Sequence, residues 1–203
     1  MYLITQTLLS KWNYIYNCAE GFEEDAYAEL VSYLRKEPQE SNEKIQNGIN
    51  FEEGVYALMR GEPLPDNCSK WESGCTAVAT RLNGGQIQVT ASRPCVVDGE
   101  TYLVYGKCDV VHAGVIHDVK FSNKSFSQFD VGKYLDSAQH SAYFYIVPGA
   151  YKFEYDVSDG QDLYTETYLR EETRPIERII HEFVQYLKNT GLIDLYHEYW
   201  KAR

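Results

Sequence analysis

The sequence predicts a single domain of the mixed α/β class, in which a mixed central β-sheet is flanked by helices. Three observations support this prediction. Apolar residues recur at three- and four-residue spacing up to about residue 82. From Gln86 the pattern changes to short β-type segments separated by turn residues, and helical spacing returns between and after them. No internal repeat or low-complexity stretch divides the chain.

The first part of the chain, residues 1–82, is expected to be a mainly helical lead-in. Its apolar spacing predicts helices over 4–17, 22–35, 44–60 and 69–81. Glu37-Pro38 and the Gly61-to-Pro65 segment separate these helices, because proline and glycine disfavour continuation of a helix.

The second part, residues 86–203, is expected to form the sheet core. Three consecutive antiparallel strands are predicted over 86–97, 101–112 and 115–122, with Ala113-Gly114 as the second turn. A helix over about 130–146 then ends before Pro148-Gly149. The remaining pattern predicts strands over 150–157 and 163–170, a helix from Arg174-Pro175 to about 188, and a short helix from about 191.

Composition limits the possible functions. The net charge is −11 and the pI is near 4.9, which argues against a broad basic surface for nucleic acid. A polyanionic substrate would therefore need local Lys or Arg groups or a bound cation. The five cysteines are odd in number and include no Cys-x-x-Cys pair, so neither a disulfide framework nor a zinc site is predicted. No apolar run approaches the ~18–20 residues of a membrane span and no signal peptide is recognised, so we expect a cytoplasmic protein.

The hairpin over 101–122 carries the most informative charges. If Ala113-Gly114 is a two-residue loop, facing residues have numbers that sum to 227, and Asp109 lies opposite Asp118. Two carboxylates facing each other destabilise a strand pair unless something neutralises them, and a divalent cation bound by oxygen ligands would do so. Lys120 lies on the same face as Asp118 because side chains alternate along a strand.

The same register places Lys107 across from Lys120, while Val110, Val119 and Phe121 point the other way, into a core. Two interpretations remain open on these local grounds. One is a metal site; the other is a charged, solvated outer face with an Asp–Lys contact. Alternation points His117 to the opposite face, so we interpret it, like His112 and His140, as structural.

The motifs on this hairpin and on the helices around it resemble those of the PD-(D/E)XK nuclease superfamily. Gly106-x-x-Asp109 followed by Ile-His-Asp118-Val-Lys120 resembles the central motif, and Gln139-His-Ser-Ala-Tyr143 matches the Gln-x-x-x-Tyr motif of the RecB-like branch. Gly48-Ile-Asn-Phe-Glu52 is similar to the helix motif that supplies a His or Glu ligand. The opening segment from Ile4 to Trp12 resembles the N-terminal helix of these proteins. The chain is thus similar to the stand-alone RecB-like nucleases of phages and mobile elements.

This resemblance implies a restriction-endonuclease-like fold and a Mg²⁺- or Mn²⁺-dependent deoxyribonuclease. Glu52, Asp109, Asp118 and the Val119 carbonyl would be metal ligands, with Glu53 as an alternative to Glu52. Lys120 would orient the attacking water or stabilise the transition state, and a role as base would require a depressed pKa. Gln139 and Tyr143 would support Lys120 and place the DNA strand. Further phosphate contacts are expected from exposed cations, namely Lys107, Lys124, Lys133, Arg170, Arg174 and Arg178.

Other features of the family are not expected in this chain. Related CRISPR-associated nucleases hold an iron–sulfur cluster with three cysteines near the C-terminus, whereas the last cysteine here is Cys108, so no cluster is predicted. No Walker motif is present, and we expect no ATP-driven motor. The leading hypothesis is an exonuclease acting on DNA ends in recombination or end-processing, with a recombinase, helicase or single-strand-binding protein as a partner. An endonuclease of the same fold and a non-catalytic DNA-binding or inhibitory module remain alternatives.

Overall fold

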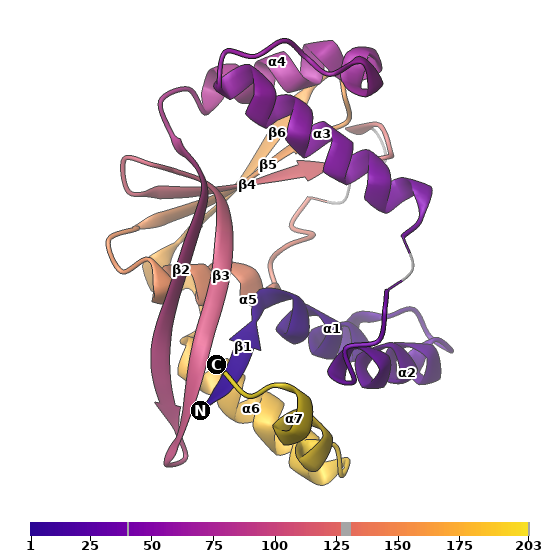
Figure 1. Cartoon of the computed structure of the whole chain (residues 1–203), viewed down its shortest axis with the longest axis vertical. Coiled ribbons are helices and arrows are strands. Elements are labelled where there is room, and N and C mark those ends of the chain that lie inside the picture. Colours follow the sequence, from indigo (N-terminus) through magenta and orange to yellow (C-terminus); the bar gives the residue numbers. More distant parts are fainter. Residues whose placement is uncertain (40, 127–130, 203) are drawn as a thin grey trace.

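The computed structural model describes residues 1–39, 41–126 and 131–202. It confirms the predicted class, since a mixed sheet is flanked by helices on both faces (Figure 1). Within these residues six strands form one sheet in the order β1-β3-β4-β5-β6, with β2 paired to β3. The strands are β1 (Tyr2–Thr5), β2 (Gln86–Val97), β3 (Glu100–His112), β4 (Val115–Phe121), β5 (Lys152–Ser158) and β6 (Leu163–Leu169). Pairs β1–β3 and β4–β5 are parallel, and the other pairs are antiparallel.

The three predicted consecutive strands are confirmed to within one residue at each end, whereas β1 was not predicted. Residues 2–5 pair in parallel with residues 102–105 of β3, so the first helix begins at Gln6 rather than at Ile4. A strand of four residues with one fully buried side chain, Ile4, is too short to reveal a two-residue period. Thr5 ends the strand and caps the helix, since its hydroxyl accepts a hydrogen bond from the Leu8 N–H.

The helices lie close to their predicted positions, with one correction before the Gln139 helix. They are α1 (Gln6–Asn17), α2 (Glu23–Leu34), α3 (Glu43–Met59), α4 (Glu72–Arg81), α5 (Ala138–Ile146), α6 (Ile176–Asn189) and α7 (Ile193–Tyr199). A 3₁₀ helix, Asp66–Trp71, precedes α4. Helix α5 begins at Ala138 instead of about residue 130, which lies outside the described residues. Glu166 accepts hydrogen bonds from the Gly132 and Tyr134 N–H groups and so holds residues 131–136 as turns.

Two hydrophobic cores position the sheet. The larger core packs α1, α2, α5, α6 and α7 against it, and the smaller core packs α3 and α4 against the β3–β4 end. Val110 and Val119 are fully buried in the smaller core and Phe121 packs against it, which confirms their predicted direction. Each strand at this end therefore has an α3/α4 face and an α5 face.

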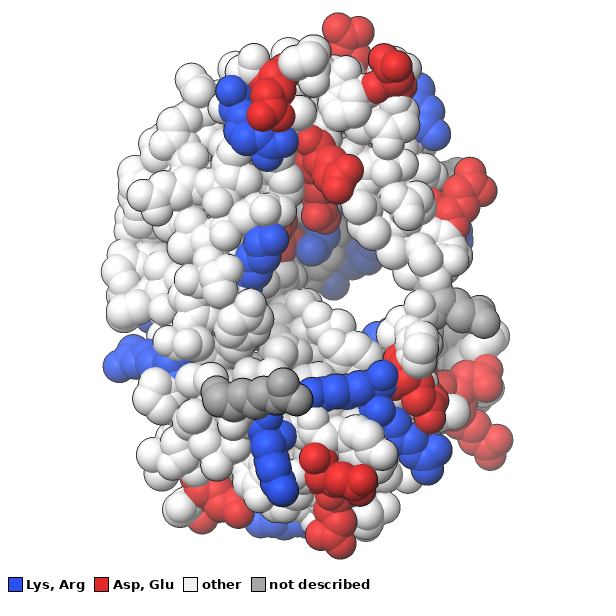
Figure 2. Space-filling view, viewed as in Figure 1, with Lys and Arg blue, Asp and Glu red and all other residues white. Residues whose placement is uncertain are grey.

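A hollow separates the two groups of helices. Figure 1 shows α3 and α4 at one end of the molecule and α1, α2, α6 and α7 at the other, with the β4 arrowhead and α3 beside the space between them. In the same orientation, Figure 2 shows that this space is a hollow of the surface and that both acidic and basic side chains are visible within it. The charged side chains in the hollow make it the candidate position of a functional site.

The described residues also bear on two expectations from composition. No helix among them is both long and apolar enough to cross a bilayer. All five cysteines are free thiols, and four of them are buried.

Packing of α5 on β3 leads to a stability prediction. A Cβ atom at Gly106 would lie 2.4 Å from the Tyr143 ring, so Gly106→Ala should destabilise the protein by about 1–3 kcal/mol. Thermal unfolding should show a fall in Tm of about 2–4 °C for each kcal/mol. Gly48→Ala is the matched control, because nothing lies within 4 Å of a Cβ at that helical position. It should leave Tm unchanged or raise it; an equal loss in both variants would contradict the packing argument.

Candidate active site

The β3–β4 hairpin has the predicted register. Residues Val110 and His117, Val111 and Ile116, and His112 and Val115 face each other, so their numbers sum to 227. Ala113 and Gly114 form the two-residue loop with φ values of +48° and +80°. This is the left-handed geometry that tight hairpin turns require at both central positions.

The strand ladder stops just before the residues of interest. Beyond Val110 and His117 the backbones no longer pair, and the Asp109 carboxylate accepts the Val119 N–H at 2.8 Å. On the other side of β3, Gln88 of β2 adopts a left-handed φ of +56°, and regular pairing resumes at Val89. Asp109 thus replaces a strand carbonyl with its side chain, and the two strands separate.

This separation corrects one expectation. Lys107 does not lie across from Lys120 in a strand pair, because the β3–β4 ladder has already ended. It faces Thr90 of β2 instead, and its side chain is exposed.

Asp118 is the buried centre of the arrangement, with 2% of its surface exposed. Its Oδ1 accepts a hydrogen bond from Gln139 Nε2 of α5. Its Oδ2 forms an ion pair with Lys120 Nζ at 2.5 Å. The Lys120 side chain is 32% exposed, so one side of the ion pair faces solvent.

The α3 helix brings Glu52 to the same place. Glu52 is half-buried and is influenced by the charges of Lys120 and Asp118, whereas Glu53 is exposed. Helix α3 therefore turns Glu52, and not Glu53, toward the strands. One turn further on, the buried Tyr56 lies beside Asp109, a contact that the sequence did not reveal although its spacing of four from Glu52 allows it.

Full ionisation of these carboxyl groups would leave an excess of negative charge in a largely buried place. Burial raises the pKa of Glu52 to about 7, with the Lys120 charge opposing and the Asp118 charge adding to the effect. Burial and the neighbouring Asp118 raise the pKa of Asp109, and burial also raises the pKa of Asp118. The three carboxylates outnumber the ammonium groups that act on them, Lys120 and, for Glu52, also Lys107, and a bound cation would relieve the difference.

The Lys120 ammonium is held in its charged form. Burial alone would lower its pKa, but the Asp118 and Asp109 charges outweigh burial and raise it. A lysine acts as a base only when its pKa is depressed, so this arrangement favours a charged donor.

The Gln-x-x-x-Tyr helix contributes its two residues differently. Gln139 contacts Asp118 directly, as described above, and is itself buried. Tyr143 is 6% exposed, and its hydroxyl donates to the Lys107 carbonyl at 3.0 Å. It therefore fixes the backbone of β3 beside Asp109 and does not present its hydroxyl to the hollow.

The other cations lie on the surface around the site or are occupied elsewhere. Lys124 and Lys133 are both exposed, and the Lys133 ammonium lies 5.6 Å from the Tyr134 ring centre. Arg170 donates to the carbonyls of residues 147, 148 and 150, beyond the C-terminal end of α5. Arg174 and Arg178 pair with Glu182. The two lysines remain candidates for phosphate contacts, whereas the three arginines have internal partners.

Tyr134 is a further residue at the site that the sequence did not indicate. Its ring stacks on Tyr155 at 4.1 Å, and Glu166 holds its backbone N–H. Burial raises its pKa to about 12, with Lys120 and Asp118 among the charges that act on it. It therefore lies near the Asp118–Lys120 pair, within a turn segment, residues 131–136, that the sequence predicts to be the start of a helix.

A second acidic cluster lies on the opposite face of β4 and could bind a metal. Ligand atoms of His117, Glu154 and Asp156 lie within 4.8 Å of one another. Within the described ranges this is the one such group of three, so the oxygens of Glu52, Asp109 and Asp118 are spaced more widely. His117 is buried on the α4 face, in agreement with its predicted direction, but Glu154 and Asp156 were not predicted.

Protein cations already balance this second cluster. Arg81 of α4 lies 2.7 Å from Glu154 and 2.8 Å from Asp156, and Lys152 lies 2.7 Å from Glu154. Burial opposes ionisation of Glu154, but Lys152 and Arg81 lower its pKa overall. On the α5 face the carboxylate pKa values are raised instead. The α5 face of β4 is therefore the face on which carboxyl groups lack enough protein cations to balance them.

Comparisons with known proteins show a fold that this chain shares with a solved structure, but they do not assign the chain to a family. No protein-family model and no curated protein matches the chain. A solved structure described as SSO0001 is similar in fold, with a TM-score of 0.53 and 13% identity over 92% of this chain and 77% of that one. A structure of LHK-Exo in complex with dAMP has a TM-score of 0.47 and 14% identity over 93% and 92%. The first likeness shows a shared fold alone.

The raised pKa of Glu52 leads to a prediction about stability and pH. A folded-state pKa of about 7, against 4.5 for the free group, means that the folded state binds more protons. Without divalent cations, stability should fall by roughly 1–3 kcal/mol as the pH rises through the window from about 4.5 to about 7. In EDTA, thermal melts of Glu52→Gln should show a smaller fall. Glu53→Gln is the exposed control and should behave like the wild type; equal slopes in both variants would exclude Glu52 from the buried cluster.

The ion pairs between Arg81 and the buried carboxylates on the α4 face lead to a second prediction. Arg81→Met leaves two buried carboxylates without their guanidinium, and this should cost on the order of 2–4 kcal/mol, reduced by the partial exposure of Arg81. Denaturant unfolding with and without EDTA measures the cost. Arg60→Met, whose partner Glu62 is exposed, is the control and should be neutral. If EDTA destabilises the wild type as much as Arg81→Met does, a metal and not Arg81 balances this cluster.

Proposed function

We propose that this protein is a Mg²⁺- or Mn²⁺-dependent DNA nuclease of the RecB-like branch of the PD-(D/E)XK superfamily. One observation carries the proposal: Glu52, Asp109 and Asp118 lie around the Lys120 ammonium, and burial together with neighbouring carboxylates raises the pKa of each of the three. These are also the residues of the sequence motifs, brought together from α3, β3 and β4. A shared fold with SSO0001 is compatible with the proposal but does not carry it.

The donor set fits a hard divalent cation. All three side chains offer carboxylate oxygens, the ligands that Mg²⁺ and Mn²⁺ prefer. Asp118 Oδ2 is paired with the Lys120 ammonium, and the Val119 carbonyl remains a further candidate ligand. When bound, such an ion would activate water and neutralise charge on the phosphoryl oxygens.

The residues of the chain have separable tasks in this proposal. Lys120 donates to the attacked phosphoryl group or to the attacking water as a charged ammonium. Gln139 fixes the orientation of the Asp118 carboxylate, which in turn holds Lys120. Tyr143 acts one step further back, by fixing the β3 backbone through the Lys107 carbonyl. Hydrolysis adds water to phosphorus and breaks a P–O bond; by resemblance the product carries a 5′-phosphate.

The substrate side of the proposal rests on the hollow and on the exposed lysines. Lys107, Lys124 and Lys133 are exposed and are proposed to contact phosphates. An exonuclease acting at DNA ends, in recombination or end-processing with a recombinase, helicase or single-strand-binding partner, is the form we favour. An endonuclease of the same fold differs in channel shape and assembly and not in this residue set.

A non-catalytic module is the second candidate, and the electrostatics argue against it. A protein that only binds DNA gains nothing from three neighbouring carboxylates whose pKa values are raised by burial and by nearby acidic groups. Such groups cost stability and are expected to be lost when no activity maintains them.

Cleavage assays test the proposal directly. Wild-type protein should cleave DNA with Mg²⁺ or Mn²⁺ and not with EDTA. Lys120→Ala should lower kcat by about 10²–10³-fold, since it removes one charged donor to the transition state. Lys188→Ala, an exposed lysine on α6, is the matched control and should retain wild-type kcat. Linear and closed circular substrates, each single- and double-stranded, separate exonuclease from endonuclease. Absence of cleavage for every substrate with both metals would exclude a nuclease.

A further inference from the structure

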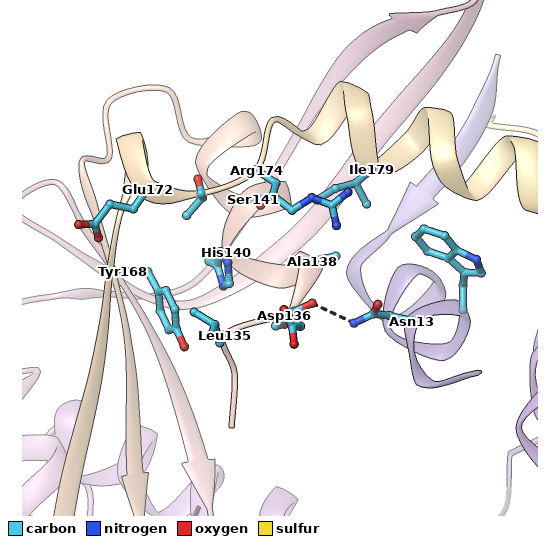
Figure 3. Close-up of a pocket in the computed structure, with 13 residues that line it drawn as sticks. Asn13, Leu135, Asp136, Ala138, His140, Ser141, Tyr168, Glu172, Arg174 and Ile179 are labelled. Atoms are coloured by element: carbon cyan, nitrogen blue, oxygen red, sulfur yellow. Dashed lines mark hydrogen bonds between the residues drawn. The ribbon is translucent and has the colours of Figure 1, made fainter. Parts of the chain in front are cut away.

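A polar cavity lies on the far side of α5 from Asp118. It has a volume of about 80 Å³ and is enclosed by α1, the turn before α5, α5 itself, β6 and the start of α6 (Figure 3). Gln139 of α5 contacts Asp118, whereas the next two residues, His140 and Ser141, line this cavity. The first turn of α5 is therefore a common wall between the cavity and the candidate active site.

Three buried polar side chains line the cavity. The Trp12 indole Nε1 is buried and has no hydrogen-bond partner among the described residues. Ser141 is 4% exposed, and His140, which is equally buried, has its Nδ1 3.4 Å from the Tyr155 hydroxyl. Buried polar groups are nearly always satisfied, so an unpartnered indole N–H in a cavity wall indicates a hydrogen-bonding guest.

The remaining walls favour a flat ring. Trp12, Ala138 and Ile179 supply buried apolar surface, and the Tyr168 ring stacks on His140 at 4.5 Å. A single water needs about 10–15 Å³ by this measure, so the cavity holds about six waters or one ring of comparable size. Leu135, which also lines it, is exposed, so a guest can enter beside the turn before α5.

The charges around the cavity select a neutral guest. Burial lowers the pKa of His140 to about 4, so its ring is uncharged at neutral pH. Arg174 is already paired with Glu182, and Asp136 and Glu172 add two carboxylates to the lining. A phosphate or carboxylate would be repelled, whereas a neutral heterocycle with both donors and acceptors is complementary.

We propose that this cavity binds a nucleobase, held by Ser141 and His140 between the apolar walls. As a place for a base of the cleaved strand, the inference rests on the proposed nuclease function, because the α5 wall then joins base binding to the phosphate site. The same chemistry would accept the base of a released nucleoside. The two sources are distinguished below.

Direct binding tests the cavity without any cleavage. Each of the four deoxynucleosides is titrated into the protein in EDTA, and chemical-shift changes in the NMR spectrum of the protein give Kd. We expect at least one to bind in the millimolar range or tighter, with shifts at Ser141 and His140. Ser141→Val should weaken binding at least tenfold, with Ser141→Ala as a milder variant if the valine does not fold. Ser69→Val, an exposed serine outside the cavity, should bind like the wild type. No nucleoside binding, which means that the cavity holds only water, would overturn the proposal, as would binding unaffected by both Ser141 variants.

A second experiment, with oligonucleotide substrates, distinguishes a base of the cleaved strand from the base of a released nucleoside. Substrates with one abasic position, moved stepwise from the cleaved bond, are compared by KM in wild type and Ser141→Val. A strand base predicts that one position raises KM in the wild type and that the variant abolishes this difference. Equal KM at all positions would overturn the strand-base form. Nucleoside binding without any DNA cleavage would refute the nuclease and leave the cavity, whereas cleavage without nucleoside binding would refute the cavity alone.

Discussion

The hydrogen bond from the Val119 N–H to Asp109 is the interaction on which the site depends. It takes the place of a strand-to-strand bond, and the β3–β4 ladder therefore ends at Val110 and His117 without leaving the Val119 amide unsatisfied. Separation of the strands gives Glu52 of α3 access to the same space. A regular ladder would close this space and place the Asp109 and Asp118 carboxylates directly opposite each other.

The two faces of β4 solve the problem of buried charge in opposite ways. On the α4 face, Arg81 and Lys152 pair with Glu154 and Asp156, and the Arg81 contacts fasten α4 to the sheet. On the α5 face, the charges of three carboxylates, Asp118, Asp109 and Glu52, all act on Lys120. A cluster of close ligand atoms is thus a poor guide to a metal site when protein cations already occupy it. Net charge within the cluster is the more informative property.

An interaction in this structure could be predicted from the sequence when its partners are close together in the chain. The hairpin register follows from a two-residue loop and from alternation, both of which are local, so Asp109, Asp118 and Lys120 could be placed near one another. The β1 strand and the late start of α5 could not be predicted, because parallel pairing with residues 102–105 and capture of Gly132 by Glu166 join distant parts of the chain. The ion pairs of Arg81 with Glu154 and Asp156 could not be predicted for the same reason. Motif resemblance added Glu52 and Gln139, which no local pattern connects to the hairpin.

Helix α5 shows how one short element can serve two neighbouring spaces. Nearly all of its residues are buried, so it has no solvated face, and successive residues point to different surroundings. Gln139 faces the charged cluster, His140 and Ser141 face the polar cavity, and Tyr143 faces β3. A displacement of this helix would therefore change the orientation of Asp118 and the shape of the cavity together. Because Arg170 binds the carbonyls of residues 147, 148 and 150 and Ser137 caps its first turn, the helix is fixed at both ends, which keeps the two spaces in register.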